Sequence, residues 1–284
     1  MLASQAFAAL GGLVVLLPVA LADLPFGDGS QSAFGRGEPP GEVTHVDHRR
    51  IVDARLSPYS AIGKFSGTMI CTAAIVLNPR IIITAGHCIT ERDGTTRRSH
   101  LSFQLGYQSG TSLGRFEATV WAIGSKQEFA GESIKEASND WAILLLDRAP
   151  MGVHPLLLSD NSLTNLQSLE RQILLPAYSI DIANAEVLSV DPDCGVRDLI
   201  WDTLIHDCMA EPGSSGAPLL MREGPEYAVI GIHTASVFAR DDNGHAAKFV
   251  GNQAIGSWMF SEAARRLSRQ LKAELVHDAD SADY

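Results

Sequence analysis

The sequence has no excess of basic residues. It contains 22 Lys and Arg against 33 Asp and Glu among 284 residues, which gives a formal net charge of -11 at pH 7. A protein that binds nucleic acid needs a basic face to neutralise phosphates. The charge balance therefore argues against a nucleic-acid partner, and the acidic C-terminal tail is typical of a solvated chain end.

Basic residues are also missing from the extreme N-terminus, where a signal peptide usually carries a positive charge. The apolar run from Ala6 to Leu21 is nevertheless short for a membrane-spanning helix and contains Pro18. It ends in Ala20-Leu21-Ala22 before Asp23, as a signal peptide and its cleavage site do. We predict a cleaved signal peptide over residues 1–22 and a secreted or periplasmic protein with no stable membrane association. An uncleaved membrane anchor is the alternative.

Cysteine is scarce, and no two of the four cysteines have the Cys-x-x-Cys spacing of a metal site. Oxidising compartments preserve disulfides, so four cysteines in an exported protein indicate two disulfides, with three possible connectivities. The sequence therefore predicts no metal site. The residues concerned are Cys71, Cys88, Cys194 and Cys208.

Residues 23–50 are rich in Gly and Pro and have no apolar periodicity, which indicates a flexible leader or propeptide. The dibasic pair Arg49-Arg50 precedes Ile51-Val52 at the end of this segment. Cleavage after Arg50, which would make Ile51 the first residue of the mature chain, is a hypothesis.

From residue 51 onward, short runs rich in β-branched residues alternate with turns, as in an all-β barrel or sandwich. We expect an N-terminal β-domain over 51–155 and a C-terminal one over 156–256. The clearest runs are 73–77, 80–84, 101–106, 118–123 and 141–146, then 172–175, 186–190, 217–221 and 227–233.

The last segment, 257–284, changes to the three- and four-residue spacing of an amphipathic helix, followed by an acidic tail. We expect this helix to pack on a β-domain rather than on a membrane surface or a partner. Its apolar positions are Phe260, Ala264, Leu267, Leu271 and Leu275.

Three motifs place a His, an Asp and a Ser in that order along the chain. They are Thr84–Cys88 around His87, Asn139–Leu146 with Asp140, and Glu211–Pro218 around Ser215. A serine flanked by glycines suggests an exposed nucleophile on a tight turn, and a serine hydroxyl needs a neutral imidazole as base. A carboxylate on the other imidazole nitrogen would hold the useful tautomer. The three motifs therefore predict an acyl-transfer site.

At these motifs the chain resembles the trypsin-like serine proteases of the chymotrypsin fold, over roughly residues 51–260. The segment Pro58–Phe65 is similar to the opening strand of the bacterial branch that includes the glutamyl endopeptidases. The resemblance implies two packed six-stranded antiparallel β-barrels with a C-terminal helix. It also implies a Cys71–Cys88 disulfide, which leaves Cys194 with Cys208.

The resemblance assigns Ser215 as nucleophile, His87 as general base and acid, and Asp140 as the residue that orients His87. The oxyanion hole maps onto the backbone N–H groups of Gly213 and Ser215, and the family needs no cofactor. One departure is Ser214. Activation of the animal enzymes uses a new amino terminus that pairs with an Asp at this position, so that ion pair cannot form here.

The substrate pocket is less clearly marked. Met209 occupies the position at which trypsins carry their basic-selective Asp, so cleavage after Lys or Arg is not supported, although Asp207 is close. His233 resembles the His with which glutamyl endopeptidases and viral 3C proteases contact a Glu or Gln side chain. No hydroxyl stands upstream in Cys208–Ala210 to support it. The neighbouring His206 is expected to be a surface or loop residue.

The sequence thus predicts an exported serine endopeptidase that cleaves proteins or peptides and requires no metal or organic cofactor. The alternative is a catalytically silent homologue that binds a partner through the same cleft. Ser214 keeps this alternative open, because an unformed oxyanion hole would leave the three side chains idle. No feature indicates an oligomeric state.

Overall fold

The structure is a computed structural model that describes residues 47–91, 93–124, 138–159, 172–200, 203–239 and 248–282. The predicted signal peptide, residues 1–22, and all of the predicted leader before residue 47 lie outside the described residues. Within the described ranges, no helix combines the length and the apolar character needed to cross a membrane.

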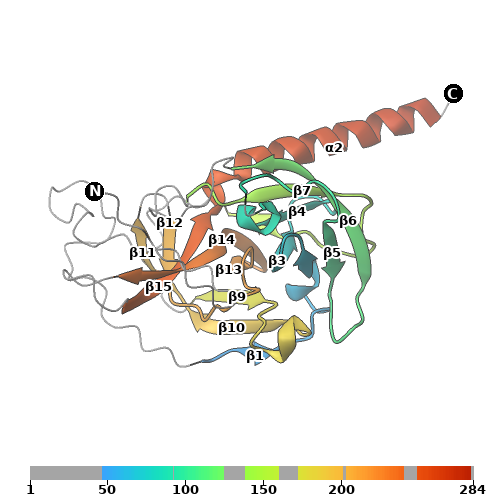
Figure 1. The fold of residues 1–284 in the computed structure, drawn as a ribbon. Coiled ribbons are helices and arrows are strands. Elements are labelled where there is room, and N and C mark those ends of the chain that lie inside the picture. Colours follow the sequence, from blue (N-terminus) through green and yellow to red (C-terminus); the bar gives the residue numbers. More distant parts are fainter. Residues whose placement is uncertain are drawn as a thin grey trace, which may run out of the picture.

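The first half of the chain forms a closed six-stranded barrel in the order β2-β3-β4-β7-β6-β5 (Figure 1). Every neighbouring pair for which a register is defined is antiparallel. The strands are β2 (Ile62–Ser66), β3 (Ile70–Ile75), β4 (Ile81–Thr84), β5 (Ser102–Leu105), β6 (Gly114–Ile123) and β7 (Ala142–Leu146).

The second half forms a nine-stranded sheet in the order β1-β10-β9-β13-β14-β15-β12-β11, with β8 parallel to β14. The strands are β1 (Arg50–Ile51), β8 (Leu157–Leu158), β9 (Ile173–Ala177), β10 (Ser189–Cys194), β11 (Val196–Ile200), β12 (Thr203–His206), β13 (Pro218–Glu223), β14 (Glu226–Ala239) and β15 (Lys248–Gly256).

The all-β class with a C-terminal helix is confirmed, and the first barrel has the expected six strands. The second sheet differs from the expected barrel, because its path through the described residues is open. One end of this open path is formed by β1. Strand β1 comes from the start of the chain and covers the edge of β10, with Arg50 opposite Val190 and Ile51 opposite Ser189. The edge is thereby protected without closure.

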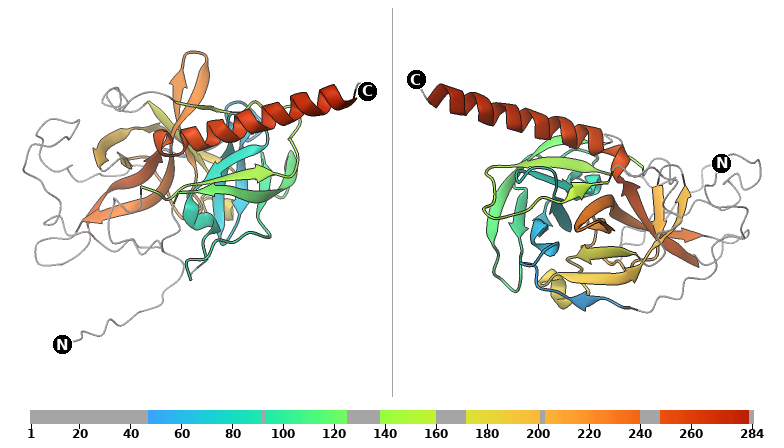
Figure 2. Two further views of the ribbon diagram at one scale, coloured as in Figure 1. Left: turned by 90° about the horizontal axis from the view of Figure 1, so that it is seen from above. Right: turned by 180° about the vertical axis from the view of Figure 1, so that it is seen from behind.

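The C-terminal helix α2 (Ser261–Ala282) lies across the first barrel and extends beyond the body of the molecule (Figure 2). The ring of Phe260, just before the helix, lies 6.2 Å from that of Trp141. Leu267 and Leu271 are buried, whereas Leu275 is 68% exposed. The expectation that Leu275 continues the packed face is wrong, because its side chain is exposed, and Figure 2 shows the C-terminal part of α2 extending beyond the body of the molecule.

The two disulfides join Cys71 to Cys88 and Cys194 to Cys208, which is the pairing that the resemblance implies. The first connects β3 to the short 3-10 helix η3 (Gly86–Ile89), and the second connects the end of β10 to the segment after β12. No described cysteine is free.

Candidate active site

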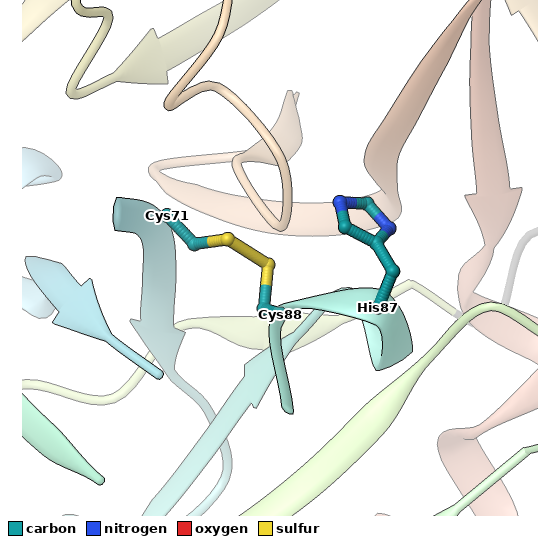
Figure 3. A group of neighbouring side chains, drawn as sticks. All are labelled: Cys71, His87 and Cys88. Carbon is teal, nitrogen blue, oxygen red and sulfur yellow. A yellow bond between two sulfur atoms is a disulfide. The ribbon is translucent and has the colours of Figure 1, made fainter. Parts of the chain in front are cut away.

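His87 lies on η3, directly after strand β4. The chain leaves the strand at Ala85, which has extended backbone angles, and then makes the single 3-10 turn that carries His87 and Cys88. Figure 3 shows the disulfide that ties this turn to β3 beside the imidazole ring of His87. The backbone of His87 is thus held by strand β4 on one side and by the disulfide at the adjacent Cys88 on the other.

Asp140 reaches His87 because of the register between β4 and β7. Thr84 is opposite Ala142, so the residues that follow Thr84 lie beside the residues that precede Ala142. Asp140 Oδ2 lies 2.7 Å from His87 Nδ1, and Oδ1 accepts the backbone N–H of His87 at 2.8 Å. The carboxylate therefore holds both the ring and the main chain of His87.

The pKa of His87 is raised above its ordinary value. Burial alone would lower it, but the negative charge of Asp140 and its hydrogen bond to the ring outweigh burial. Protonated His87 therefore stabilises the fold below the unfolded-state pKa, and this contribution is lost as pH rises through the folded-state pKa. A role as general base requires the neutral ring, which is present only above that higher pKa.

Ser215 lies on the turn before β13, between two glycines with left-handed backbone, Gly213 at φ 98° and Gly216 at φ 80°. The turn packs tightly against the first barrel. A Cβ on Gly216 would stand 2.1 Å from Thr84 Oγ1 and 2.3 Å from the carbonyl oxygen of Thr72. Glycine is required there both by the backbone angle and by this close approach.

Thr72 of β3 links the first barrel to this turn by hydrogen bonds. Its side chain is fully buried. Its N–H donates to the carbonyl of Ser215 at 2.9 Å, and its hydroxyl donates to the carbonyl of Gly213 at 3.0 Å. The same hydroxyl oxygen accepts the N–H of Tyr178 at 2.9 Å. One residue thus fixes the two carbonyl groups on either side of the Ser214–Ser215 peptide, one through its backbone N–H and the other through its hydroxyl.

The N–H groups of Gly213 and Ser215 make no hydrogen bond to another described residue, whereas those of Ser214, Gly216 and Ala217 are all paired. The carbonyl in the same peptide plane as each of these N–H groups is held: that of Pro212 accepts the N–H of Ile180 at 2.7 Å, and that of Ser214 accepts the N–H of Ala217 at 2.9 Å. Both unpaired N–H groups are therefore fixed in direction. Two preorganised, unpaired donors are what an oxyanion hole requires.

Ser214 stands at the position where the animal enzymes carry an Asp, and it makes a different interaction there. Its side chain is completely buried, and its hydroxyl oxygen lies 2.7 Å from that of Ser179. It also accepts the N–H of Glu211 at 3.2 Å. A neutral hydrogen-bonded pair therefore occupies the site where an ion pair would otherwise stand.

His233, on β14, and His206, on β12, form a buried pair. Nδ1 of His233 lies 3.2 Å from Nε2 of His206, and the ring planes are nearly perpendicular at 81°. Burial lowers the pKa of His233 well below its ordinary value, and the nearby His206 and His87 lower it further. The expectation that His206 is a surface or loop residue is wrong. It ends strand β12, in which all four residues are buried, and is itself fully buried.

Asp207, the residue through which a basic pocket might still have formed, is already engaged. Its Oδ1 accepts the N–H of Gly195 at 2.7 Å, and its Oδ2 accepts Nε of Arg197 at 2.7 Å. Its charge is therefore paired locally. Met209, at the position of the basic-selective Asp of trypsins, is held by a different carboxylate: its N–H donates to Asp191 Oδ2 at 2.8 Å.

Cys71, Cys88 and His87 place two sulfurs and a ring nitrogen within 4.8 Å of one another, a spacing that a metal ion would accept (Figure 3). The two sulfurs are bonded to each other. A metal binds the thiolate form of cysteine, and a disulfide has none to offer. The cluster is therefore explained by the disulfide.

The comparisons with known proteins agree with this architecture. The trypsin-like peptidase domain matches residues 71–232, more than half of the chain, and the chain therefore belongs to this family. No curated protein is similar enough to count as a match.

Two solved structures share the fold. A Glu endopeptidase in complex with MPD is 18% identical, with a TM-score of 0.57, over 81% of this chain and 97% of the other. The protease Anisep from Arthrobacter nicotinovorans is 16% identical, with a TM-score of 0.52, over 73% of this chain and 93% of the other.

The contact between Asp140 and His87 makes a prediction that does not depend on activity. Asp140→Asn removes the charge that raises the pKa of His87, so the midpoint of the His87 titration should fall below that of the wild type. Side-chain NMR of histidine-labelled protein measures it, with the charge-matched Asp147→Asn variant as control. An unchanged midpoint in Asp140→Asn would show that the carboxylate does not act on the ring.

Proposed function

We propose that the protein is an exported serine endopeptidase with Ser215 as nucleophile, His87 as general base and Asp140 as the orienting acid. The observation that carries the proposal is the 2.7 Å contact between Asp140 and His87, set beside a glycine-bounded turn with two unpaired N–H groups. Membership in the trypsin-like peptidase family supports the same chemistry.

The reaction needs only these groups. His87 takes the hydroxyl proton of Ser215 as Oγ bonds to the substrate carbonyl carbon, and the resulting oxyanion is stabilised by the N–H groups of Gly213 and Ser215. Protonated His87, stabilised by Asp140, then gives its proton to the leaving amine as the C–N bond breaks. Water attacks the acyl-enzyme by the same proton transfers and regenerates Ser215.

The alternative is a silent homologue that binds a partner in the same cleft. It depends on an unformed oxyanion hole around Ser214. The hydrogen bonds of Ser214 to Ser179 and of Thr72 to Gly213 argue for a turn held in place without the acid. We therefore favour the enzyme.

Export is part of the proposal. Two disulfides suit an oxidising compartment rather than the cytosol. The apolar N-terminal segment, 1–22, would supply the signal peptide. Whether the destination is the periplasm or the medium depends on the host envelope.

Covalent labelling tests the nucleophile. A fluorophosphonate probe should label the secreted protein at Ser215, and Ser215→Ala should abolish labelling and lower peptide hydrolysis by about 10⁶-fold. The exposed serine variant Ser112→Ala is the matched control and should label normally. Mass spectrometry of the labelled peptide identifies the site. Folded wild-type protein that takes up no label would favour the silent homologue.

We further propose that His233 binds the side chain of a Glu or Gln residue after which the substrate is cleaved. Because Nδ1 of His233 faces His206, Nε2 is the nitrogen that would meet the substrate, and burial keeps the ring neutral. A neutral ring with its proton on Nε2 donates one hydrogen bond to a carboxylate or amide oxygen. The name of the structural neighbour, a Glu endopeptidase, agrees with this pocket.

The pocket is tested by a ratio of rates. His233→Ala should lower cleavage after Glu and Gln about tenfold relative to cleavage after Leu, since one lost hydrogen bond is worth about 1 to 1.5 kcal/mol. A peptide library measures both rates in one experiment, with the exposed His154→Ala as control. Equal ratios in wild type and His233→Ala would remove His233 from the pocket.

A further inference from the structure

Arg49 is nearly buried, although it belongs to the segment that the sequence marks as a flexible leader. Its side chain is 3% exposed. The guanidinium binds Asp47 through Nε at 3.0 Å and Nη2 at 2.8 Å, and Asp181 through Nη1 at 3.1 Å and Nη2 at 2.5 Å. Both contacts are two-pronged, which is the geometry that a guanidinium makes best and an ammonium cannot reproduce.

Asp181 belongs to the loop that supports the turn around Ser215, residues 211–216. Three consecutive residues just before it contact that turn. A Cβ on Gly213 would stand 2.3 Å from the carbonyl oxygen of Tyr178, Ser179 Oγ lies 2.7 Å from Ser214 Oγ, and the N–H of Ile180 donates to the carbonyl of Pro212 at 2.7 Å. By binding Asp181, Arg49 fixes the end of the loop on which Gly213 rests.

The charges around this loop require a cation. Burial raises the pKa of Glu211, the negative charges of Asp181 and Asp47 raise it further, and the positive charge of Arg49 lowers it. Glu211 begins the turn that carries Ser215, since its carbonyl accepts the N–H of Ser214 at 2.9 Å. Without Arg49, three carboxylates would repel one another beside the turn.

The start of β1 lies at the surface. A new amino terminus created by processing would instead have to insert into the protein to pair with an acid. Ile51 is 58% exposed and pairs with Ser189 at the edge of the second sheet. The position at which the animal enzymes carry an Asp is Ser214, whose hydroxyl is already hydrogen-bonded to that of Ser179. Cleavage after Arg50 would create an amino group with no acid at that position and would separate Arg49 from the folded chain.

We infer that Arg49 is a positioning residue for the oxyanion-binding turn, that the active protein retains it, and that any removal of the leader occurs before Asp47. The inference rests on the proposed function for its effect on catalysis. Its structural part, the support of residues 211–215 by Arg49, stands on the contacts alone.

The test compares secreted wild-type protein with Arg49→Gln, Arg49→Lys and Asp181→Asn, and uses the exposed Arg55→Gln as a control of equal charge change. Three quantities are measured on each: the rate of fluorophosphonate labelling, kcat and KM on a peptide, and hydrogen exchange of the peptide that covers 208–220. N-terminal sequencing of the labelled wild-type protein gives its first residue.

Arg49→Gln should lower labelling and kcat at least tenfold with little change in KM, because the oxyanion hole acts on the transition state rather than on bound substrate. Exchange over 208–220 should rise in Arg49→Gln and stay at the wild-type level in Arg55→Gln. Arg49→Lys should recover part of the rate. The double variant Arg49→Gln, Asp181→Asn should have a labelling rate no lower than that of the slower single variant, since both substitutions remove the same Arg49–Asp181 interaction.

The outcomes separate the two proposals. If wild type takes up no label but Arg49→Gln still raises exchange over 208–220, the enzyme proposal fails and the support by Arg49 stands. If wild type is labelled and Arg49→Gln matches it in rate and exchange, the role of Arg49 is refuted. Labelled protein that begins at Ile51 would also refute it, because Arg49 is then absent from the active form.

Discussion

The site depends on one constraint, which is the attachment of the turn that carries Ser215 to the first barrel, although this turn leads into the second sheet. Ser215 lies just before β13 of the second sheet, whereas His87 follows β4 and Asp140 precedes β7 of the first barrel. Thr72 makes the attachment with two donated hydrogen bonds, to the carbonyls of Gly213 and Ser215. Because Thr72 is fully buried, water cannot replace these bonds without cost. The fit of Gly216 against Thr84 and Thr72 leaves the turn little freedom.

The rest of the site follows from strand register. The pairing of Thr84 with Ala142 brings Asp140 to His87. In the second sheet, His233 N–H donates to Ala217 at 2.8 Å and its carbonyl accepts the N–H of Gly216 at 2.7 Å, so the candidate pocket residue and the turn share two hydrogen bonds. Main-chain pairing thus sets the relative positions of groups that are far apart in sequence, and the disulfide at Cys88 reinforces the position of His87.

Much of this was predictable from local sequence patterns. The motifs around His87, Asp140 and Ser215 are each short, and family resemblance supplies their roles and the pairing of the cysteines. The apolar spacing predicts α2 up to Leu271 but not the exposure of Leu275, since the pattern carries no information on where the barrel ends. The pairing of β1 with the edge of β10 could not be predicted either, because its two residues show no strand pattern of their own.

The contacts that support the site could not be predicted from the sequence, and the physical reason is the same for all of them. Thr72, the Ser179–Ser214 pair, the burial of His206 and the binding of Asp181 by Arg49 each join residues brought together only by the fold. Thr, Ser, His and Arg are ordinary surface residues in any single sequence, and nothing in their neighbours marks them as buried. Arg49 lies in a segment whose composition indicates a leader, so its packing contradicts the local pattern.

The central claim is that the turn held by Thr72 presents Ser215 and two N–H donors to one reacting carbonyl. A crystal structure of the protein inactivated by a fluorophosphonate tests it most directly. The account predicts phosphorus bonded to Ser215 Oγ, with one phosphonyl oxygen about 2.7–3.1 Å from the nitrogens of both Gly213 and Ser215. It also predicts that Thr72 stays bonded to the carbonyls of the turn. A phosphonyl oxygen that points away from both nitrogens, or a turn released from Thr72, would contradict the account.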